Sequence, residues 1–423
     1  MHNPIQLRPT RRAVLTGIGA GLSTIAIPAW AAKPAPLTLP PAATPDDAAS
    51  LLDEIAWNLI ELEPATATGL GIDTGDHAHL RARLGDSSPE GVARLAEVLR
   101  SDLAAARAVD RAGLDAATIT SLEVVESAYS TALEGVALPY GDVAVGGWRN
   151  APYIVIQNVG AYLDIPRFLD SDHPVKTRED AEAYLSRLEA YPGVLDGELE
   201  RMQAATALGV IPPSFLLDKA IAQMDSTLAD ARTGGGLVSS LTGRAKDIPG
   251  EWERRAGAIV AGSVVPALER QLAQLRTQRG RAKDTAGMWA QPGGEEWYGW
   301  ALKASTTTAL TADEIHRMGL EQLAEIQARM DPILRDLGYT KGGVGPRAAS
   351  LSEDPRFKFA EGDPGRAEIM EFIRQRIAWI RADRWLDLDQ ARLAPARLED
   401  LLAYPPRDRM PCLLLYGDTG MGK

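Results

Sequence analysis

The sequence has few of the residues that form disulfide frameworks and zinc sites. One cysteine, Cys412, occurs in 423 residues, so a disulfide framework and a cysteine-based zinc site are both excluded. The histidines are His2, His77, His79, His173 and His316. No two of them have three residues between them, so the helical H-E-x-x-H zinc motif is absent from the chain.

Other function classes also lack their sequence signals. The chain contains no G-x-S-x-G and no S-x-x-K motif, which leaves serine-hydrolase chemistry without a marked nucleophile. Lys and Arg number 45 against 57 Asp and Glu, and the formal net charge of -12 argues against a nucleic-acid partner. Beyond residue 31 no apolar run approaches the ~18 residues that cross a bilayer, so we expect no stable membrane span.

The N-terminus has the pattern of an export signal. Arg11 and Arg12 precede an apolar run over residues 13–27, and an A-x-A cleavage pattern ends at Ala31. Paired arginines before a weakly apolar core favour the twin-arginine route, which exports folded proteins. We therefore predict a twin-arginine-type signal peptide over residues 1–31, cleavage after Ala31, and a periplasmic or secreted bacterial protein that engages the twin-arginine export machinery. A Sec-type signal or a retained anchor is the alternative.

The rest of the chain has a mostly helical pattern. Residues 32–43 are rich in Pro and Ala and predict a linker, and residues 44–380 predict a large multi-helix body. N-capping residues followed by proline or an acid mark several helix starts, as at Ser88-Pro89-Glu90. Residues 138–170 are instead rich in Gly, Pro and aromatic residues, and we expect an ordered surface loop there with a short strand at 153–156. The predicted fold class is mostly α, without an internal repeat.

The C-terminal end has a nucleotide-binding pattern. An apolar run of strand length, residues 412–416, leads into a G-x-x-x-x-G-K sequence. In a P-loop such glycines let backbone N–H groups wrap phosphate oxygens, and the lysine reaches the outer phosphates. The positions concerned are Gly417, Asp418, Thr419, Gly420, Met421, Gly422 and Lys423. No Ser/Thr for Mg²⁺ and no helix follow them in this sequence, so we predict an incomplete and non-functional nucleotide site.

Many short segments of the helical body match one bacterial family. They are Leu62–Gly71 (LEPATATGLG), Pro152–Val155 with Gln157, Gly160–Pro166, Phe168–Asp170, His173-Pro174, Gly209–Pro213, Phe215–Ala220, Trp300–Leu302, Thr306–Thr308 and Asp313–His316. Through them, residues 46–380 resemble the family called domain of unknown function 885 (DUF 885). The resemblance implies exported, largely helical peptidases of the gluzincin kind, whose H-E-x-x-P-G-H-like zinc motif lies further downstream. Because this chain lacks that motif, zinc and a peptide substrate are expected only for an intact family member.

The tail carries a second resemblance. Residues 380–385 (IRADRW), 396–402 (ARLEDLL) and 405–411 (PPRDRMP), followed by the P-loop start, are similar to the beginning of TniB-type transposition ATPases. We therefore predict that residues 381–423 are a truncated ATPase-like stub. The chain would then be a chimera, in which a mobile element or an assembly join interrupted the gene of an exported peptidase.

The remaining histidines favour structural roles. His316 follows Glu314 at the start of a predicted helix and lacks the further ligands that a metal would need. His77 and His79 lie in a Gly/Asp-rich loop, where we expect them to be exposed to solvent. His173 precedes a proline and is expected to brace a turn.

An aromatic and acidic cluster near residue 297 also favours a structural role. Glu295 and Glu296 are neighbours of Trp297, Tyr298 and Trp300. Adjacent residues of a helix diverge by about 100°, so the two carboxylates cannot both face one cleft. We expect the tryptophans to pack in the core and the acids to be exposed.

The sequence therefore predicts no catalytic and no metal-ligating residue in this chain. The leading hypothesis is an exported DUF 885-type protein that is truncated or chimeric, lacks the zinc site and is inactive. Two alternatives remain: a non-enzymatic periplasmic binding or scaffold protein, and a fragment of a P-loop transposition ATPase fusion.

Overall fold

The computed structural model describes residues 45–147 and 149–381. Apart from Arg381, the predicted signal peptide, linker and ATPase-like stub lie outside the described residues, as do Arg11, Arg12 and the P-loop positions 417–423. Within the described residues the chain forms fourteen α-helices and no β-strand, which confirms the prediction of a mostly α fold. Contacts divide the chain into a first unit that ends at Ala312 and a second that begins at Asp313.

The first unit contains the helices α1 to α11. Their bounds are α1 Pro45–Leu62, α2 Pro64–Leu70, α3 Pro89–Ala108, α4 Ala116–Val136, α5 Ala161–Ser171, α6 Arg178–Ala207, α7 Ser214–Arg232, α8 Leu237–Arg244, α9 Trp252–Ile259, α10 Val265–Arg279 and α11 Gly294–Thr306. Short 3₁₀ segments lie at Gly75–Ala82 (η2) and Met288–Ala290 (η4), and a π turn at Val260–Val264 (η3) joins α9 to α10.

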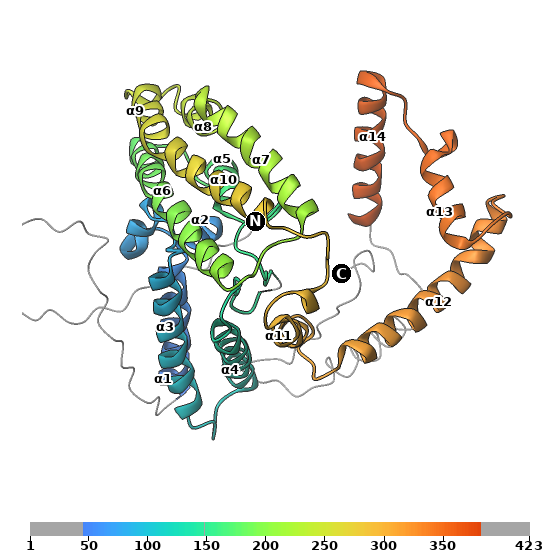
Figure 1. Cartoon of the computed structure of the whole chain (residues 1–423), viewed down its shortest axis with the longest axis horizontal. Coiled ribbons are helices and arrows are strands. Elements are labelled where there is room, and N and C mark those ends of the chain that lie inside the picture. Colours follow the sequence, from blue (N-terminus) through green and yellow to red (C-terminus); the bar gives the residue numbers. More distant parts are fainter. Residues whose placement is uncertain (1–44, 148, 382–423) are drawn as a thin grey trace, which may run out of the picture. The chain divides into compact units, whose positions relative to one another are not determined.

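Helices α1, α3 and α4 pack side by side around one hydrophobic core (Figure 1). Leu51, Leu99 and Leu122, one from each helix, are buried there. Ser88 and Asp115 each accept hydrogen bonds from backbone N–H groups in the first turn of the helix that follows. These caps satisfy amide groups that have no partner within a helix, and α3 begins where the sequence predicts.

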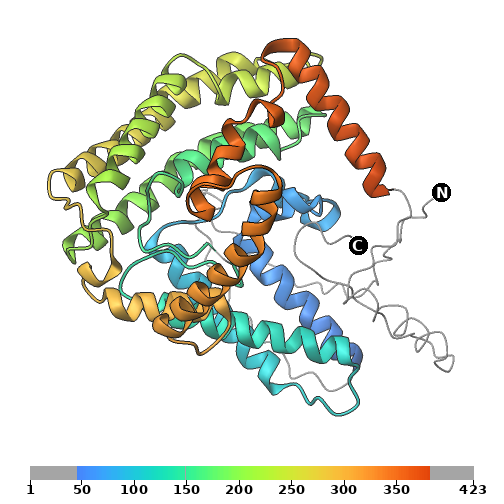
Figure 2. The ribbon, with the colours of Figure 1, turned by 90° about the vertical axis from the view of Figure 1, so that its right-hand side faces the viewer.

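Helix α6 is the centre of a second layer of the first unit. It packs against α5, α9 and α10, and α10 packs against α7 (Figure 2). Its buried face includes Tyr184, Leu188 and Leu195. Thr177 and Asp180 form a capping box at its start, because the side chain of each accepts from the backbone N–H of the other.

The segment between α4 and α5 differs from the prediction in two ways. Residues 153–156 form no strand, and only isolated bridges join Asp142 to Ala151 and Ile156 to Val159. A strand needs a neighbouring strand to pair with, and this all-helical body supplies none among its described residues. The loop also ends at residue 160, because α5 begins at Ala161, and residues 153–155 are buried instead of crossing the surface.

The second unit contains α12 (Ala312–Asp336) apart from its first residue, together with α13 (Val344–Glu353), a 3₁₀ turn at Pro355–Phe357 and α14 (Gly362–Arg381). Arg347 is buried within it, pairs with Asp331 and donates to the carbonyl oxygen of Tyr339 across 3.1 Å. This arginine joins the end of α12 to α13. Among the described residues, no helix combines the length and apolar character needed to cross a membrane.

Candidate binding site

The first unit contains a pocket of about 410 Å³. Its walls come from the end of α1, the first turns of α3, the last turn of α4, residues 137–143 and the last third of α6. Ligand sites in proteins usually enclose about 300–1,000 Å³, so the volume suits a small molecule. Much of the lining is aliphatic and consists of Leu62, Val92, Leu95, Val136, Leu138 and Ile154.

Charged side chains also line this pocket, and most of them are paired. Arg201 donates to Oδ1 of Asp142 across 2.7 Å and to the carbonyl oxygen of Gly141 across 2.9 Å. Arg94 of α3 forms an ion pair with Asp86, which lies in the loop before that helix. The carboxylate of Glu63 is left without a cationic partner among the side chains that the structure describes.

Glu63 is the residue that joins α1 to α2. Pro64 begins α2 directly after it, so the chain turns at this point and places the carboxylate at the pocket. The residue is exposed to solvent, although neighbouring protein atoms partly dehydrate its carboxyl group. This loss of hydration raises the pKa of the carboxyl, and the negative charge of Asp142 raises the pKa further. A cation bound in the pocket would relieve both effects.

A second carboxyl group lies behind the pocket, one helical turn before Arg201. Glu198 is buried, and its Oε1 accepts from the backbone N–H of Ala161 across 2.8 Å, while Oε2 accepts from Nε2 of Gln271 across 2.8 Å. Gly160 precedes α5 and has no side chain to cap it, so Glu198 supplies the cap from another helix. Burial raises the pKa of Glu198 to about 7.

Gly141, a residue of the pocket lining, allows α11 to pack closely on the pocket loop. Its φ is 101°, and a Cβ placed on it would lie 2.6 Å from Nε1 of Trp297 and 3.0 Å from the carbonyl oxygen of Ala151. Both the positive φ and the short distances require a residue without a side chain. The indole of Trp297 therefore packs directly on the backbone of the loop that contains the pocket residue Asp142.

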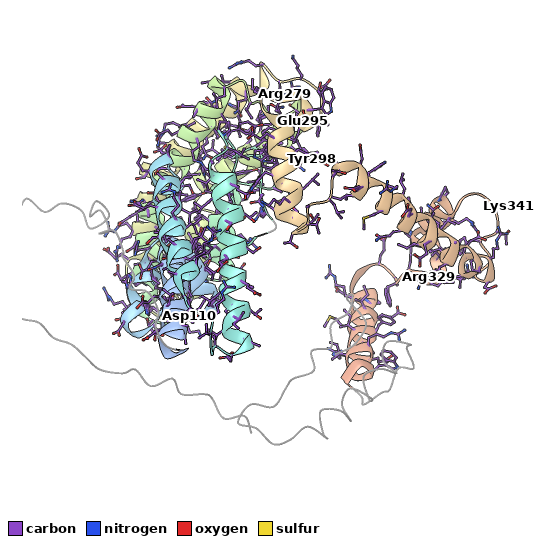
Figure 3. All side chains as sticks on the ribbon, turned by 90° about the horizontal axis from the view of Figure 1, so that it is seen from below. Asp110, Arg279, Glu295, Tyr298, Arg329 and Lys341 are labelled. Carbon is purple, nitrogen blue, oxygen red and sulfur yellow. The ribbon has the colours of Figure 1, made fainter. Side chains whose placement is uncertain are left out.

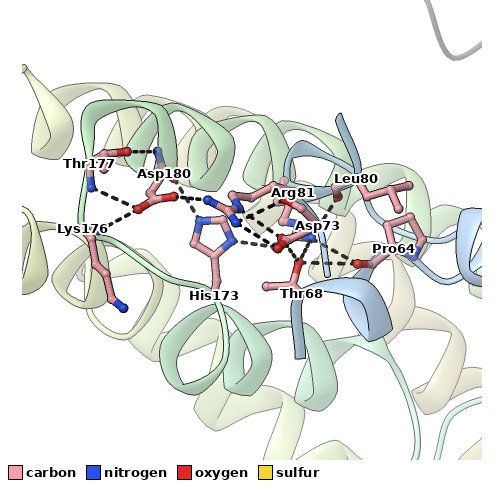
Figure 4. A network of polar contacts seen from close by, with 10 residues as sticks. Pro64, Thr68, Asp73, Leu80, Arg81, His173, Lys176, Thr177 and Asp180 are labelled. Carbon is pink, nitrogen blue, oxygen red and sulfur yellow. Dashed lines mark hydrogen bonds and ion pairs between the residues drawn. The ribbon is translucent and has the colours of Figure 1, made fainter. Parts of the chain in front are cut away.

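A separate network of buried polar groups joins α2 and η2 to α6 and to the loop between α5 and α6 (Figure 4). Arg187 of α6 is fully buried and donates to Nδ1 of His173 across 2.7 Å and to Oγ1 of Thr68 across 2.7 Å. It also donates to the carbonyl oxygens of Leu80 and Arg83 across 3.1 Å and 2.9 Å. All three nitrogen atoms of the guanidinium thus donate hydrogen bonds, which satisfies this buried charged group.

Arg81 carries the same network to the start of α6. It donates to Oδ1 of Asp73 across 2.9 Å and to Oδ1 of Asp180 across 2.8 Å. Despite burial, these and other hydrogen bonds lower the pKa of both carboxyl groups. Neither Arg81 nor Arg187 lines the pocket, so the network holds helices together and does not contact a pocket ligand.

The comparisons with known proteins give the family. A family model described as "Bacterial protein of unknown function (DUF885)" matches residues 64–404, which is most of the chain. The chain belongs to the DUF885 family. The match begins at α2, covers the pocket residues other than Leu62 and Glu63, and continues through residues 382–404, outside the described part of the structure. It thus includes the first part of the segment that resembles a TniB-type ATPase.

Solved structures share the fold of this DUF885 chain. A candidate lipoprotein from Colwellia psychrerythraea matches with a TM-score of 0.74 at 24% identity, covering 80% of this chain and 59% of that chain. A candidate lipoprotein of unknown function from Shewanella oneidensis matches with a TM-score of 0.53 at 12% identity, covering 80% and 57%. The DUF885 chain thus spans less than two thirds of either protein. A search of curated protein sequences finds no match to it.

The histidines of this DUF885 chain have different surroundings. His77 stacks on Trp57 with ring centroids 3.4 Å apart, so the prediction of an exposed ring was wrong for this residue. His79 and His316 are exposed. His173 is buried and braces the start of α6, where its Nε2 lies 3.0 Å from the carbonyl oxygen of Asp180.

No set of these side chains fits the zinc that the family resemblance implies. His79 and Glu61 are 2.9 Å apart, but Nδ1 of His77 lies 3.9 Å from the same carboxylate oxygen, and Arg83 donates to the other oxygen across 2.9 Å. The guanidinium already neutralises that carboxylate. In the described part of the chain, no three or more His, Cys, Asp or Glu side chains are grouped to hold a metal ion.

The aromatic and acidic cluster of α11 is arranged as the sequence predicts. Trp297 and Trp300 are buried and pack edge to face with ring centroids 5.7 Å apart. Glu295, Glu296 and Tyr298 are exposed on the same helix, where Figure 3 labels Glu295 and Tyr298. The two carboxylates are therefore no catalytic pair.

Sequence reasoning did not identify the charged residues of the pocket. Glu63, Asp142 and Arg201 are far apart in the sequence and form no spaced motif. One signal was present, since Glu63 belongs to the family-like segment Leu62–Gly71. That segment indicated family membership. Only the tertiary structure, in which α6 contacts the 137–143 loop, shows that Glu63 of this segment lines the pocket.

Proposed function

We propose that this chain is the helical body of an exported DUF885 protein, that it binds a small ligand, and that it does not itself cleave peptides. The pocket that holds Glu63, Asp142 and Arg201 carries this proposal, because it supplies charged and apolar groups for binding. The pocket contains no histidine or cysteine, and the sequence has no H-E-x-x-H motif. Nothing in it would activate a water molecule through zinc.

The family resemblance supports a wider proposal for longer relatives. An intact DUF885 protein that contains the downstream zinc motif would hydrolyse peptides with a metal-activated water. The present chain would supply the helical wall against which such a substrate lies. For the present chain, the proposal coincides with the alternative of a non-enzymatic periplasmic binding or scaffold protein, which the presence of a pocket without metal ligands favours. The ATPase-fusion alternative rests on residues outside the described structure and stays a prediction.

Zinc content and peptide hydrolysis test the proposal together. The purified chain is dialysed against zinc, its metal content is measured by mass spectrometry, and hydrolysis of a mixed peptide library is followed with and without a chelator. We expect much less than one zinc per chain and no chelator-sensitive cleavage, whereas a true catalytic site would bind about one zinc. Stoichiometric zinc with chelator-sensitive cleavage would overturn the proposal.

Export is tested separately with the signal arginines. Replacing Arg11 and Arg12 by lysine should abolish twin-arginine export, because that route reads the paired arginines. The measurement is the amount of processed chain in the periplasmic fraction, with Arg8→Lys as the matched control. Unchanged export of the double variant would instead indicate a Sec-type signal.

A further inference from the structure

We propose that the pocket between α1, α3, α4 and α6 binds a small organic cation, a primary ammonium group on an apolar body, with the carboxylate of Glu63 as its counter-charge. This inference rests on the proposed ligand-binding function, whose ligand class it names, and it does not depend on any peptidase role. It rests on the inventory of charges around the cavity, on the apolar character of the remaining wall and on the volume of the cavity.

The charges leave one carboxylate for a ligand. Arg201 is committed to Asp142 and to the carbonyl oxygen of Gly141, and Arg94 is committed to Asp86. Glu63 is the remaining charged group in the lining. An unpaired carboxylate in the lining of a pocket is stabilised by an arriving cation and destabilised by an arriving anion. The pocket should therefore discriminate strongly by the sign of the ligand charge.

The rest of the wall argues for an organic cation over a metal ion. Calcium and magnesium need about six or more oxygen ligands, and Glu63 offers a single uncommitted carboxylate. Leu95, Val136 and Leu138 line the same cavity and gain from contact with an apolar group. At about 410 Å³ the cavity has room for an ammonium group with an aliphatic chain of several carbons.

Three probes that share a 3-methylbutyl group distinguish the effect of charge from that of shape. They are 3-methylbutylamine, 4-methylpentanoate and 3-methylbutanol, titrated into the full chain at pH 7 by calorimetry or ligand-observed NMR. We expect the amine to bind in roughly the millimolar range and the other two about tenfold more weakly or worse. Equal binding of the carboxylate and the amine, or no binding of the amine, would overturn the proposal.

Three variants test whether the site is the one described. Glu63→Gln should weaken amine binding about tenfold or more, since it removes the counter-charge and keeps the shape. Glu97→Gln is the matched control, because Glu97 is exposed on α3 and does not line the pocket. Ala204→Leu should block binding by filling the pocket from an exposed position on α6.

Circular dichroism melting establishes that each variant is folded before its binding is compared. If Glu63→Gln does not fold, Ala204→Leu and the three probes of different charge still decide the question. Equal binding by Glu63→Gln and Glu97→Gln contradicts the proposal. So does binding of Ca²⁺ that depends on Glu63 while the amine fails to bind. Neither outcome affects the zinc and hydrolysis measurements, which test the proposed function.

Discussion

Arg187 donates to Nδ1 of His173 across 2.7 Å in the buried interior of the first unit. Because the guanidinium has no acceptor, Nδ1 must carry the lone pair and Nε2 the proton. Nε2 then donates to the carbonyl oxygen of Asp180 across 3.0 Å. One arginine thus fixes the tautomer of a histidine and connects α6, the loop before it and the segment around η2.

Replacing Arg187 by methionine should strongly destabilise the first unit. The change leaves several buried acceptors without donors, and each such group costs about 1–3 kcal/mol, so we expect a loss of at least about 3 kcal/mol of unfolding free energy. Arg232→Met is the control, because Arg232 forms only an exposed ion pair with Glu269, worth at most about 1 kcal/mol. Urea denaturation followed by circular dichroism gives both values, and equal losses would contradict the assignment.

Acid should destabilise the protein through His173. Burial is the main cause that lowers the pKa of this imidazole to about 4, from 6.5 in the unfolded chain. The unfolded state therefore takes up a proton first, and stability falls as the pH falls from about 6.5 to about 4, by about 3 kcal/mol. His173→Gln keeps an acceptor and a donor but does not titrate, so it should lack this decline. Parallel stability curves for the two proteins would show that His173 titrates normally.

Glu198 should give a pH dependence of the opposite sign. Burial raises the pKa of its carboxyl to about 7, whereas the unfolded value is 4.5. Its favourable contribution is complete below pH 4.5 and is lost as the pH rises through 7, a change of about 3 kcal/mol. The amide of Glu198→Gln can still accept from the backbone N–H of Ala161. The unfolding free energy of the variant relative to the wild type should therefore increase as the pH rises over this range. Unfolding free energies measured from pH 4 to 8 decide this, and a constant difference between the two proteins would refute it.

Adding a methyl group at Gly141 should disturb the contact with α11. The new Cβ would lie 2.6 Å from Nε1 of Trp297, so Gly141→Ala should cost about 1–3 kcal/mol, and the positive φ adds strain. Gly299→Ala is the control, because nothing lies within 4 Å of a Cβ there and alanine favours the helix. Combining Gly141→Ala with Trp297→Phe should cost less than the sum of the single changes. Strict additivity would mean that the two residues are not in contact.

The helix starts show how much local sequence determined. Ser88, Asp115 and Thr177 cap helices in the structure because their side chains accept from amides only two or three residues away. Such contacts need no tertiary structure, so the pattern of residues could predict the start at Ser88. The burial of Trp297 and Trp300 was also predictable, because two large aromatic rings on one face of a helix gain most by packing in the core.

The failed strand at residues 153–156 shows the opposite case. Its apolar run suits a strand, but a strand exists only with a partner, and here the run packs as an irregular buried segment. The stacking of His77 on Trp57 could not be predicted either. The two rings come into contact only because the fold places η2 against α1.

The sequence by itself determined the family, the helical class and the absence of the zinc motif, because all three depend on residue types and their spacing along the chain. Tertiary structure alone decided which carboxylate faces the pocket without a partner. Arg201 could have paired with several acids, and it is the 2.7 Å contact with Asp142 that leaves Glu63 uncompensated. Charge balance in a cavity depends on distances between elements, and such distances are fixed only when the helices pack.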